Sequence, residues 1–202
     1  MGVKVKEEFN YIPKIAKAIE YLGSHHLEIG IFGEDDSHIL MIARVHEFGV
    51  VITPKKAQSL TIPLIKEAVG KSPSEFKDLF IPKGTNVLAR KKGDGFEAVY
   101  ALVKSVEIPE RSFMRAGFDS NKKDFQKKGE HLIQQAIALE IAPKTALDVL
   151  GRYIADQIQV YLTKLREPPN SPVTISNKGS SNPLIGKDEH LRDSITYKIV
   201  SG

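Results

Sequence analysis

Histidines and carboxylates gather in the first quarter of the chain, and they are the side chains best suited to bind a metal. They are His25, His26, Glu34, Asp35, Asp36, His38 and His46. Catalytic zinc usually takes three such ligands, often including two histidines one helical turn apart. His38 and His46 are two turns apart, and "HEFGV" lacks the second histidine of H-E-x-x-H. Because Asp35 and Asp36 suit the start of a helix, we expect helix caps and surface groups here, with no metal or cofactor.

Two further motifs fail on their spacing. The segment "GSSNPLIGKD" places six residues between Gly179 and Gly186, whereas a phosphate-binding loop needs four, followed by Lys and a hydroxyl residue. The G-x-S-x-G elbow of a serine nucleophile is absent from the sequence. Carboxylate pairs such as Glu7-Glu8 lie in polar stretches, where solvated charge is the ordinary explanation. We therefore expect no catalytic residues, and a protein that is not an enzyme.

The composition is that of an ordinary protein with an aliphatic core. The 202 residues are 41% hydrophobic, lack Cys and Trp, and carry a net charge of +4. Without cysteine, disulfides and thiolate chemistry are excluded. No apolar run approaches the ~20 residues of a membrane span, and the first residues do not resemble a signal peptide, so we expect synthesis in the cytoplasm and no membrane partner.

A run of lysines lies at the start of one predicted helix, at Lys122, Lys123, Lys127 and Lys128. A solvated helix face is the default interpretation of such a run. A nucleic-acid-binding accessory protein is the alternative function that this basic face suggests, and steep salt dependence of DNA binding would identify it.

Helical periodicity appears at both ends of the chain. Apolar residues from Ile12 to Leu22 predict a first helix, and residues 38–48 predict a second that ends at Gly49. Residues 120–141 predict a third helix with one apolar stripe. Pro143 is expected to open a fourth that runs to about Arg166.

Short apolar runs punctuated by proline fill residues 50–108 and predict a small inserted antiparallel β-unit. Asp94-Gly95 is its strongest hairpin signal. Residues 167–190 predict a long polar loop or arm. The tail alternates Ile195, Tyr197 and Ile199 with polar residues, which predicts a strand pairing with residues 27–33 or with the β-unit. The expected fold is a single α+β domain over residues 1–202, an antiparallel sheet packed by long amphipathic helices.

Several stretches, taken in order, resemble the phage virion morphogenesis family. They are "ARVHEFG", "IPERSFMRAGFD", "TALDVLGRYIADQIQ", "PPNSPVTISNKGSSNPLIG" and "LRDSITY". Members usually carry a Thr-Gly turn before the last of these, and residues 186–190 stand in its place here. The family positions are His46, Glu47, Phe48, Gly49, Pro109, Arg111, Phe113, Pro169, Gly179, Pro183, Leu184, Leu191, Arg192, Ser194 and Ile195.

The resemblance implies a structural virion protein of a tailed phage or prophage, a tail-completion or head–tail connector protein of the neck. Its partners would be the tail tube or tail terminator and the head connector, and it would form a homo-oligomeric ring, with a hexamer as one option. Nucleic acid would be incidental. We expect Phe48 and Phe113 to anchor the core, and Arg192 and Asp193 to form a local ion pair.

The polar arm and the hairpin tip near Gly93 are expected to contact neighbouring subunits or the tail, because they are long and polar. If so, deletion of Asn170 to Asn182 leaves a folded protein that fails to join heads to tails. Normal assembly would contradict this expectation.

Overall fold

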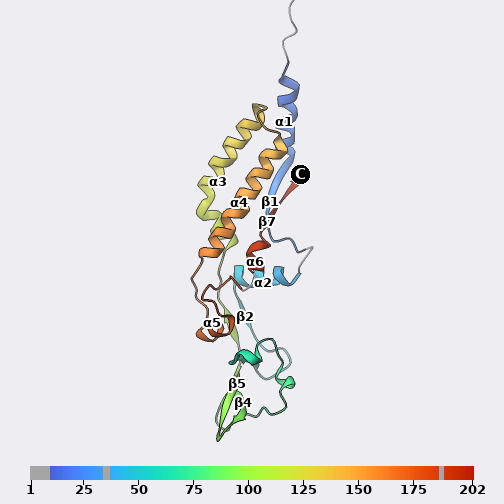
Figure 1. Ribbon diagram of the computed structural model, residues 1–202. Helices are drawn as coiled ribbons and strands as arrows, with labels where there is room; N and C mark the ends of the chain where they lie inside the picture. The colour runs from blue at the N-terminus through green and yellow to red at the C-terminus, as the bar shows by residue number, and fades with distance from the viewer. Residues whose placement is uncertain (1–9, 34–36, 187–188) are drawn as a thin grey trace, which may run out of the picture.

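The structure is a computed structural model that describes residues 10–33, 37–186 and 189–202. It is a mixed α+β fold with small antiparallel sheets, as predicted. Figure 1 shows an elongated molecule, with the long helices at one end and the β4–β5 hairpin at the other. We call residues 10–33, 37–48, 109–186 and 189–202 the helical body, and residues 50–108 the β-subdomain. No helix in the described part of the chain is both long and apolar enough to cross a membrane.

Two long antiparallel helices form the helical body, α3 (Met114–Ile137) and α4 (Pro143–Lys164). Pro143 stands at the start of α4, where its missing amide hydrogen costs nothing. Gly129 of α3 faces Leu150 of α4, and a Cβ there would make an ordinary contact at 3.4 Å. Helix α1 (Ile12–Ser24) packs beside both.

The predicted terminal strand exists, and it pairs with the first strand. β1 (His25–Gly30) and β7 (Thr196–Ser201) form an antiparallel ladder in which Leu27 lies opposite Ile199. Helix α4 packs on this ladder, and Gly151 makes the contact possible, since a Cβ there would lie 2.3 Å from Tyr197. The last strand of the chain therefore pairs with the first one.

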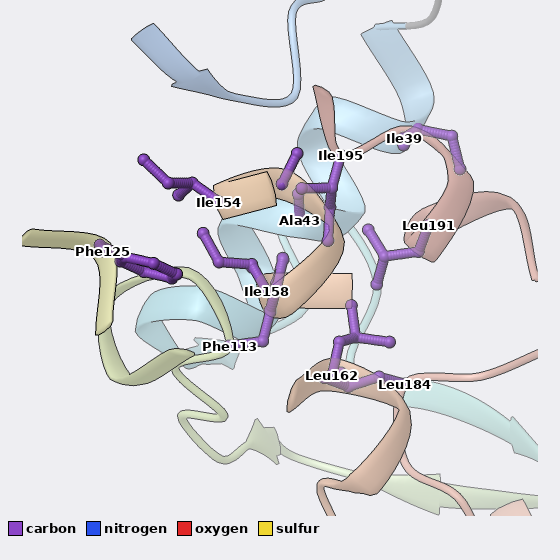
Figure 2. Close-up of a cluster of buried hydrophobic side chains, with 11 residues drawn as sticks. Ile39, Ala43, Phe113, Phe125, Ile154, Ile158, Leu162, Leu184, Leu191 and Ile195 are labelled. Atoms are coloured by element: carbon purple, nitrogen blue, oxygen red, sulfur yellow. The ribbon is translucent and has the colours of Figure 1, made fainter. Parts of the chain in front are cut away.

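The main core lies where α2 (Ser37–Phe48), α4 and the short helix α6 (His190–Asp193) converge. Figure 2 shows its side chains pointing toward one another from these elements and from the start of α3. Phe113 is fully buried, which confirms it as a core anchor, and Ile195 is 2% exposed. Phe48, the other expected anchor, is 60% exposed, so that prediction was wrong.

A narrow two-stranded ribbon at the base of the β-subdomain connects it to the body. It consists of β2 (Val50–Ile52) and β6 (Val106–Ile108), paired antiparallel. All three residues of β2 are exposed. A ribbon this short gains little stability by itself, so its position depends on what holds its two ends.

The inserted β-unit is confirmed as a three-stranded antiparallel sheet in the order β3-β5-β4. Its strands are β3 (Leu60–Pro63), β4 (Val87–Lys92) and β5 (Gly95–Val103). The hairpin turn centres on Gly93 and Asp94, one residue before the predicted pair, and Gly93 takes φ +59°. The 3₁₀ turns η1 (Lys66–Ala68) and η2 (Pro73–Glu75) lie between β3 and β4. Ala68, Val99 and Tyr100 form the buried centre of this unit.

The arm differs from the prediction of an extended polar loop. It contains a helix, α5 (Pro172–Lys178), which Ser171 caps at its start and Gly179 ends in a left-handed conformation at φ +73°. Pro183 and Leu184 are buried, and Leu184 joins the main core. Residues 187 and 188 of the predicted arm lie outside the described residues. The last part of the arm is thus packed onto the body, whereas α5 has no buried residue and its Asn177 donates to the carbonyl of Pro63 in β3 at 3.0 Å.

Candidate functional site: the polar junction

A buried carboxylate joins the end of α2 to the start of α3. Glu47 is 6% exposed and accepts hydrogen bonds from the amides of Met114 and Arg115, at 2.9 and 3.1 Å. Ser112 Oγ and Arg115 Nε donate to the same carboxylate, at 2.8 and 2.9 Å. Glu47 therefore satisfies amide donors that a helix start leaves free, and its charge complements the helix dipole.

These donors keep Glu47 ionised. Burial by itself would raise the pKa of the carboxyl group. The amides of Met114 and Arg115, with the side chains of Ser112 and Arg115, outweigh that effect and leave the pKa below its usual value. Because four donors already bind its oxygens, this carboxylate is placed to stabilise the fold and not to accept a proton from a substrate.

A buried cation lies on the other side of the same segment. Arg111 is 4% exposed, and its Nε donates to the carbonyl of Pro168 at 2.7 Å. A second guanidinium nitrogen donates to the carbonyl of Pro169 at 3.0 Å and to Asn170 Oδ1 at 3.2 Å. No carboxylate among the described residues pairs with it, and burial lowers the pKa of Arg111. The guanidinium fixes the start of the arm by binding neutral oxygens.

His46 completes this contact as a neutral acceptor. Its Nδ1 lies 3.3 Å from a guanidinium nitrogen of Arg111, which can only donate, and its carbonyl accepts from the Arg111 amide at 2.7 Å. Burial first, then the charges of Arg111 and Lys178, lower the pKa of His46 to about 4. The imidazole is thus uncharged at neutral pH.

Asn182 ties the far end of the arm to the body. Its Oδ1 accepts from the amides of Leu184 and Ile185, at 2.9 and 2.8 Å, and its Nδ2 donates to the carbonyl of Thr163 at 3.0 Å. Lys178 Nζ donates to the carbonyls of Asn182 and Pro183. We call the set of Glu47, Arg111, His46, Lys178 and Asn182 the polar junction.

Most family positions meet at or beside the polar junction. His46, Glu47 and Arg111 form it, and the carbonyl of Pro169 accepts from Arg111. Gly49 has φ +67°, and a Cβ there would lie 2.8 Å from the amide nitrogen of Glu110, one residue after Pro109. Phe113, Leu184, Leu191 and Ile195 form part of the adjoining core.

The remaining positions have local roles. Phe48 lies on the surface under the Arg115 guanidinium, whose central carbon is 4.7 Å from the ring centre. Arg192 pairs with Asp193 and Glu189, which confirms the local ion pair. Ser194 Oγ donates to the carbonyl of His190 at 2.7 Å. Gly179 ends α5.

Four of the seven histidines and carboxylates that the sequence groups together, His25, His26, His38 and His46, lie within the described residues. Glu34, Asp35 and Asp36 lie outside the described residues. Among the residues that the structure does describe, no three His, Asp or Glu side chains are placed to hold a metal. His25 stacks on Tyr21 with ring centres 3.9 Å apart, and its Nδ1 lies 2.9 Å from the Tyr21 carbonyl oxygen.

A groove of about 550 Å³ opens beside the junction, between the start of α3 and the end of α4. Its rim mixes cations, Lys164 and Arg166, with carboxylates, Glu110 and Glu167. This mixture of signs suits protein contact better than selective binding of an anion or a cation.

Sequence reasoning missed Lys178, Asn182 and Ser112. Asn182-Pro183 is a typical signal for an asparagine side chain that binds backbone amides further along, so it could have indicated the fixed end of the arm. The roles of Lys178 and Ser112 depend on contacts across the fold and leave no local pattern.

The chain matches no protein-family model, no curated protein and no solved structure. The resemblance described above therefore stays a prediction.

Proposed function

We propose that this chain is a structural protein of a tailed-phage virion that completes the tail end or neck and joins tail to head. It is made in the cytoplasm of the bacterial host and ends in the virion. There it assembles as a ring between the tail tube or tail terminator and the head connector.

The observation that carries the proposal is the meeting of distant resembling stretches at one place. "HEFG", "PERSF" and "PPN" are far apart in the sequence, yet residues from all three contact one another through Arg111 and Glu47. The shared contacts support treating these stretches as one structural unit, and the resemblance then supplies the function that we propose for it.

The chemistry of the polar junction also supports a structural role. Its carboxylate is saturated by four donors, its histidine is neutral, and its arginine holds three backbone or amide oxygens. These bonds hold a connecting ribbon and an arm in place. A subunit of a ring needs such fixed placement, because a heterologous interface closes only at one rotation angle.

Deletion of the gene from its phage tests the proposal. The deletion lysate is expected to contain full heads and separate tails, with few joined particles, and expression of the chain from a plasmid should restore joining. A deletion phage that assembles normal particles would contradict the proposal.

A further inference from the structure

The β-subdomain is basic. Residues 50–108 carry ten Lys or Arg and six Asp or Glu, a net charge of +4 that equals that of the entire chain. The helical body carries sixteen Lys or Arg and thirteen Asp or Glu, a net charge of +3 over more than twice as many residues. The β-subdomain, at the opposite end of the molecule from the long helices (Figure 1), is therefore the more strongly basic region for its size.

Large apolar side chains are exposed near the tip of this basic end. Phe80, Ile81 and Phe96 are 39%, 57% and 54% exposed. Phe80 and Phe96 meet edge to face with ring centres 6.4 Å apart. The backbone of Phe80 pairs with that of Ala89 in β4, at 2.9 Å in both directions, so the ring is held at a fixed place. Phe80 and Phe96 therefore form one exposed aromatic pair, and the exposed Ile81 follows Phe80 directly in the sequence.

Strand pairing separates this aromatic pair from the ionic face of the hairpin. Phe80 pairs with Ala89, and Phe96 lies opposite Lys91, so these four share one face. Arg90 and Glu97 lie opposite each other on the other face, where Arg90 also reaches Glu67 of η1 at 2.9 Å. No α-helix packs extensively on β3, β4 or β5 within the described residues. On this face the rings of Phe80 and Phe96 remain accessible to a partner, at 39% and 54% exposure, whereas Ala89 is fully buried.

The cations next to the aromatic pair differ in whether a carboxylate neutralises them. Arg90 and Lys92 both pair with Glu97. Lys91, which faces outward beside Phe96, and Lys83, two residues after Ile81, are exposed and form no ion pair with any described residue. We call Phe80, Ile81, Lys83, Lys91 and Phe96 the tip patch. It is an apolar centre with free positive charge at its edge.

We propose that the tip patch docks onto an acidic surface of another virion protein, one with an apolar centre rimmed by carboxylates. The inference rests on the function proposed above and names the part of the chain that meets the tail or head. Complementary charge selects such a partner and speeds its encounter, while buried aromatic side chains supply most of the affinity.

A second copy of the tip patch does not fit, because two basic patches would repel each other. A nucleic acid fits less well than a protein. The exposed carboxylate of Asp94 lies in the hairpin turn, Glu97 neutralises two of the nearby cations, and Ile81 offers no flat surface for a base to stack on.

Heads and tails purified from the deletion phage provide the test. They are mixed with the wild-type protein or with variants, joined particles are counted by infectivity, and protein bound to each is measured by co-sedimentation. One variant is Ile81→Ser with Phe96→Ser, and another is Lys83→Glu with Lys91→Glu. The matched control is Lys122→Glu with Lys123→Glu on α3, which are also exposed. Circular dichroism checks that each variant is folded.

We expect the apolar pair to weaken binding to heads or tails about 100-fold and the lysine pair about tenfold, with the control within twofold. If the apolar pair does not fold, the lysine pair alone decides, because its side chains make no ion pair that folding could lose. Wild-type affinity of the folded variants would overturn the tip-patch inference and leave the proposed function standing.

Two other outcomes would also overturn it. If the wild-type protein itself fails to join heads to tails, the proposed function falls and the inference falls with it. If the variants join normally but lose binding to a 20-nucleotide single-stranded DNA, the patch serves nucleic acid instead.

Discussion

The helical body and the β-subdomain are stabilised in different ways. Eleven buried residues from several helices form the main core of the body, whereas three form the buried centre of the β-subdomain. The β-subdomain carries a net charge of +4 within 59 residues, against +3 within the 128 residues of the helical body, and it also carries the exposed Phe80, Ile81 and Phe96. The larger buried core should make the body contribute more to the stability of the protein, while the β-subdomain exposes apolar and basic side chains to solvent.

The polar junction is where these two regions are joined. Glu47 and Arg111 are among the few buried charged or polar side chains of the described chain, and both bind the segment between β6 and α3 or its neighbours. A buried charge that loses its partners lowers the free energy of unfolding strongly. Substitutions in the polar junction should therefore cost more stability than the loss of a single exposed contact.

The largest effect is expected in the core of the body. Phe113→Ala should lower the free energy of unfolding by about 4 kcal/mol, because it removes a fully buried ring and leaves a cavity. Urea denaturation followed by circular dichroism measures this loss. Phe118→Ala, five residues further along in α3 and 39% exposed, is the control and should cost clearly less. Equal losses would contradict the placement of the main core.

Removal of the buried carboxylate comes next. Glu47→Ala should lower the free energy of unfolding by about 3 kcal/mol, since four donors lose their acceptor and the start of α3 loses its cap. Chemical denaturation at neutral pH provides the measurement. Glu110→Ala removes the other, exposed partner of Arg115 and should cost less than about 1 kcal/mol. A stable Glu47→Ala protein would argue against the junction.

Mild acid should destabilise the polar junction. The pKa of His46 is about 4 when folded and 6.5 when unfolded, so the unfolded state binds more protons between these values. Stability is therefore lost as the pH falls from 6.5 to 4, by up to about 3 kcal/mol. The depressed pKa of Glu47 acts in the same direction at lower pH, where its protonation removes further stability.

His46→Asn tests this pH dependence. The amide oxygen can replace the imidazole nitrogen as an acceptor for Arg111 but does not titrate. Denaturation midpoints measured between pH 4 and pH 7 should vary less in the variant than in the wild type. His38→Asn serves as the control on the same helix. An unchanged slope in His46→Asn would show that another group is responsible.

Replacement of Gly49 should cost more stability than replacement of Gly93 in the hairpin turn. Gly49→Ala places a Cβ 2.8 Å from the backbone nitrogen of Glu110 at φ +67°, which should cost about 2 kcal/mol. Gly93→Ala meets a similar φ of +59° in open space and should cost about 1 kcal/mol. Melting temperatures of both variants give the comparison, and a larger loss for Gly93 would contradict it.

The smallest expected effect is confined to the β-subdomain. Tyr100→Phe removes a hydroxyl that donates to the carbonyl of Lys71 at 3.0 Å, which should cost about 1 kcal/mol. Hydrogen exchange should speed up in β3, β4 and β5 while α3 and α4 stay protected. Uniform acceleration throughout the chain would show that the two regions unfold as one.

Local patterns predicted the elements whose causes are local. The periodicity after Pro143 predicted α4, and the alternation from Ile195 predicted β7 to within a residue. Helix α3 begins at Met114, six residues before the predicted start, because a distant side chain, Glu47, caps it. No local pattern could reveal that cap.

The predictions for the arm and for Phe48 were wrong for the same physical reason: both segments are placed by contacts with residues distant in the sequence. The polar composition of residues 167–190 concealed Leu184, which reaches the core only because Asn182 and Lys178 turn the chain inward. Phe48 follows a buried residue, but it leaves the core face of α2 and lies under Arg115 instead. Deletion of residues 170–182 should therefore destabilise the body, contrary to the expectation from sequence.

Electron microscopy of tails tests the central claim most directly. Tails purified from the deletion phage are imaged in negative stain before and after addition of the purified protein. The proposed function predicts a ring of new density at the head-proximal end of the tails, and particles competent to join heads. Bare tails at saturating protein concentration would contradict it.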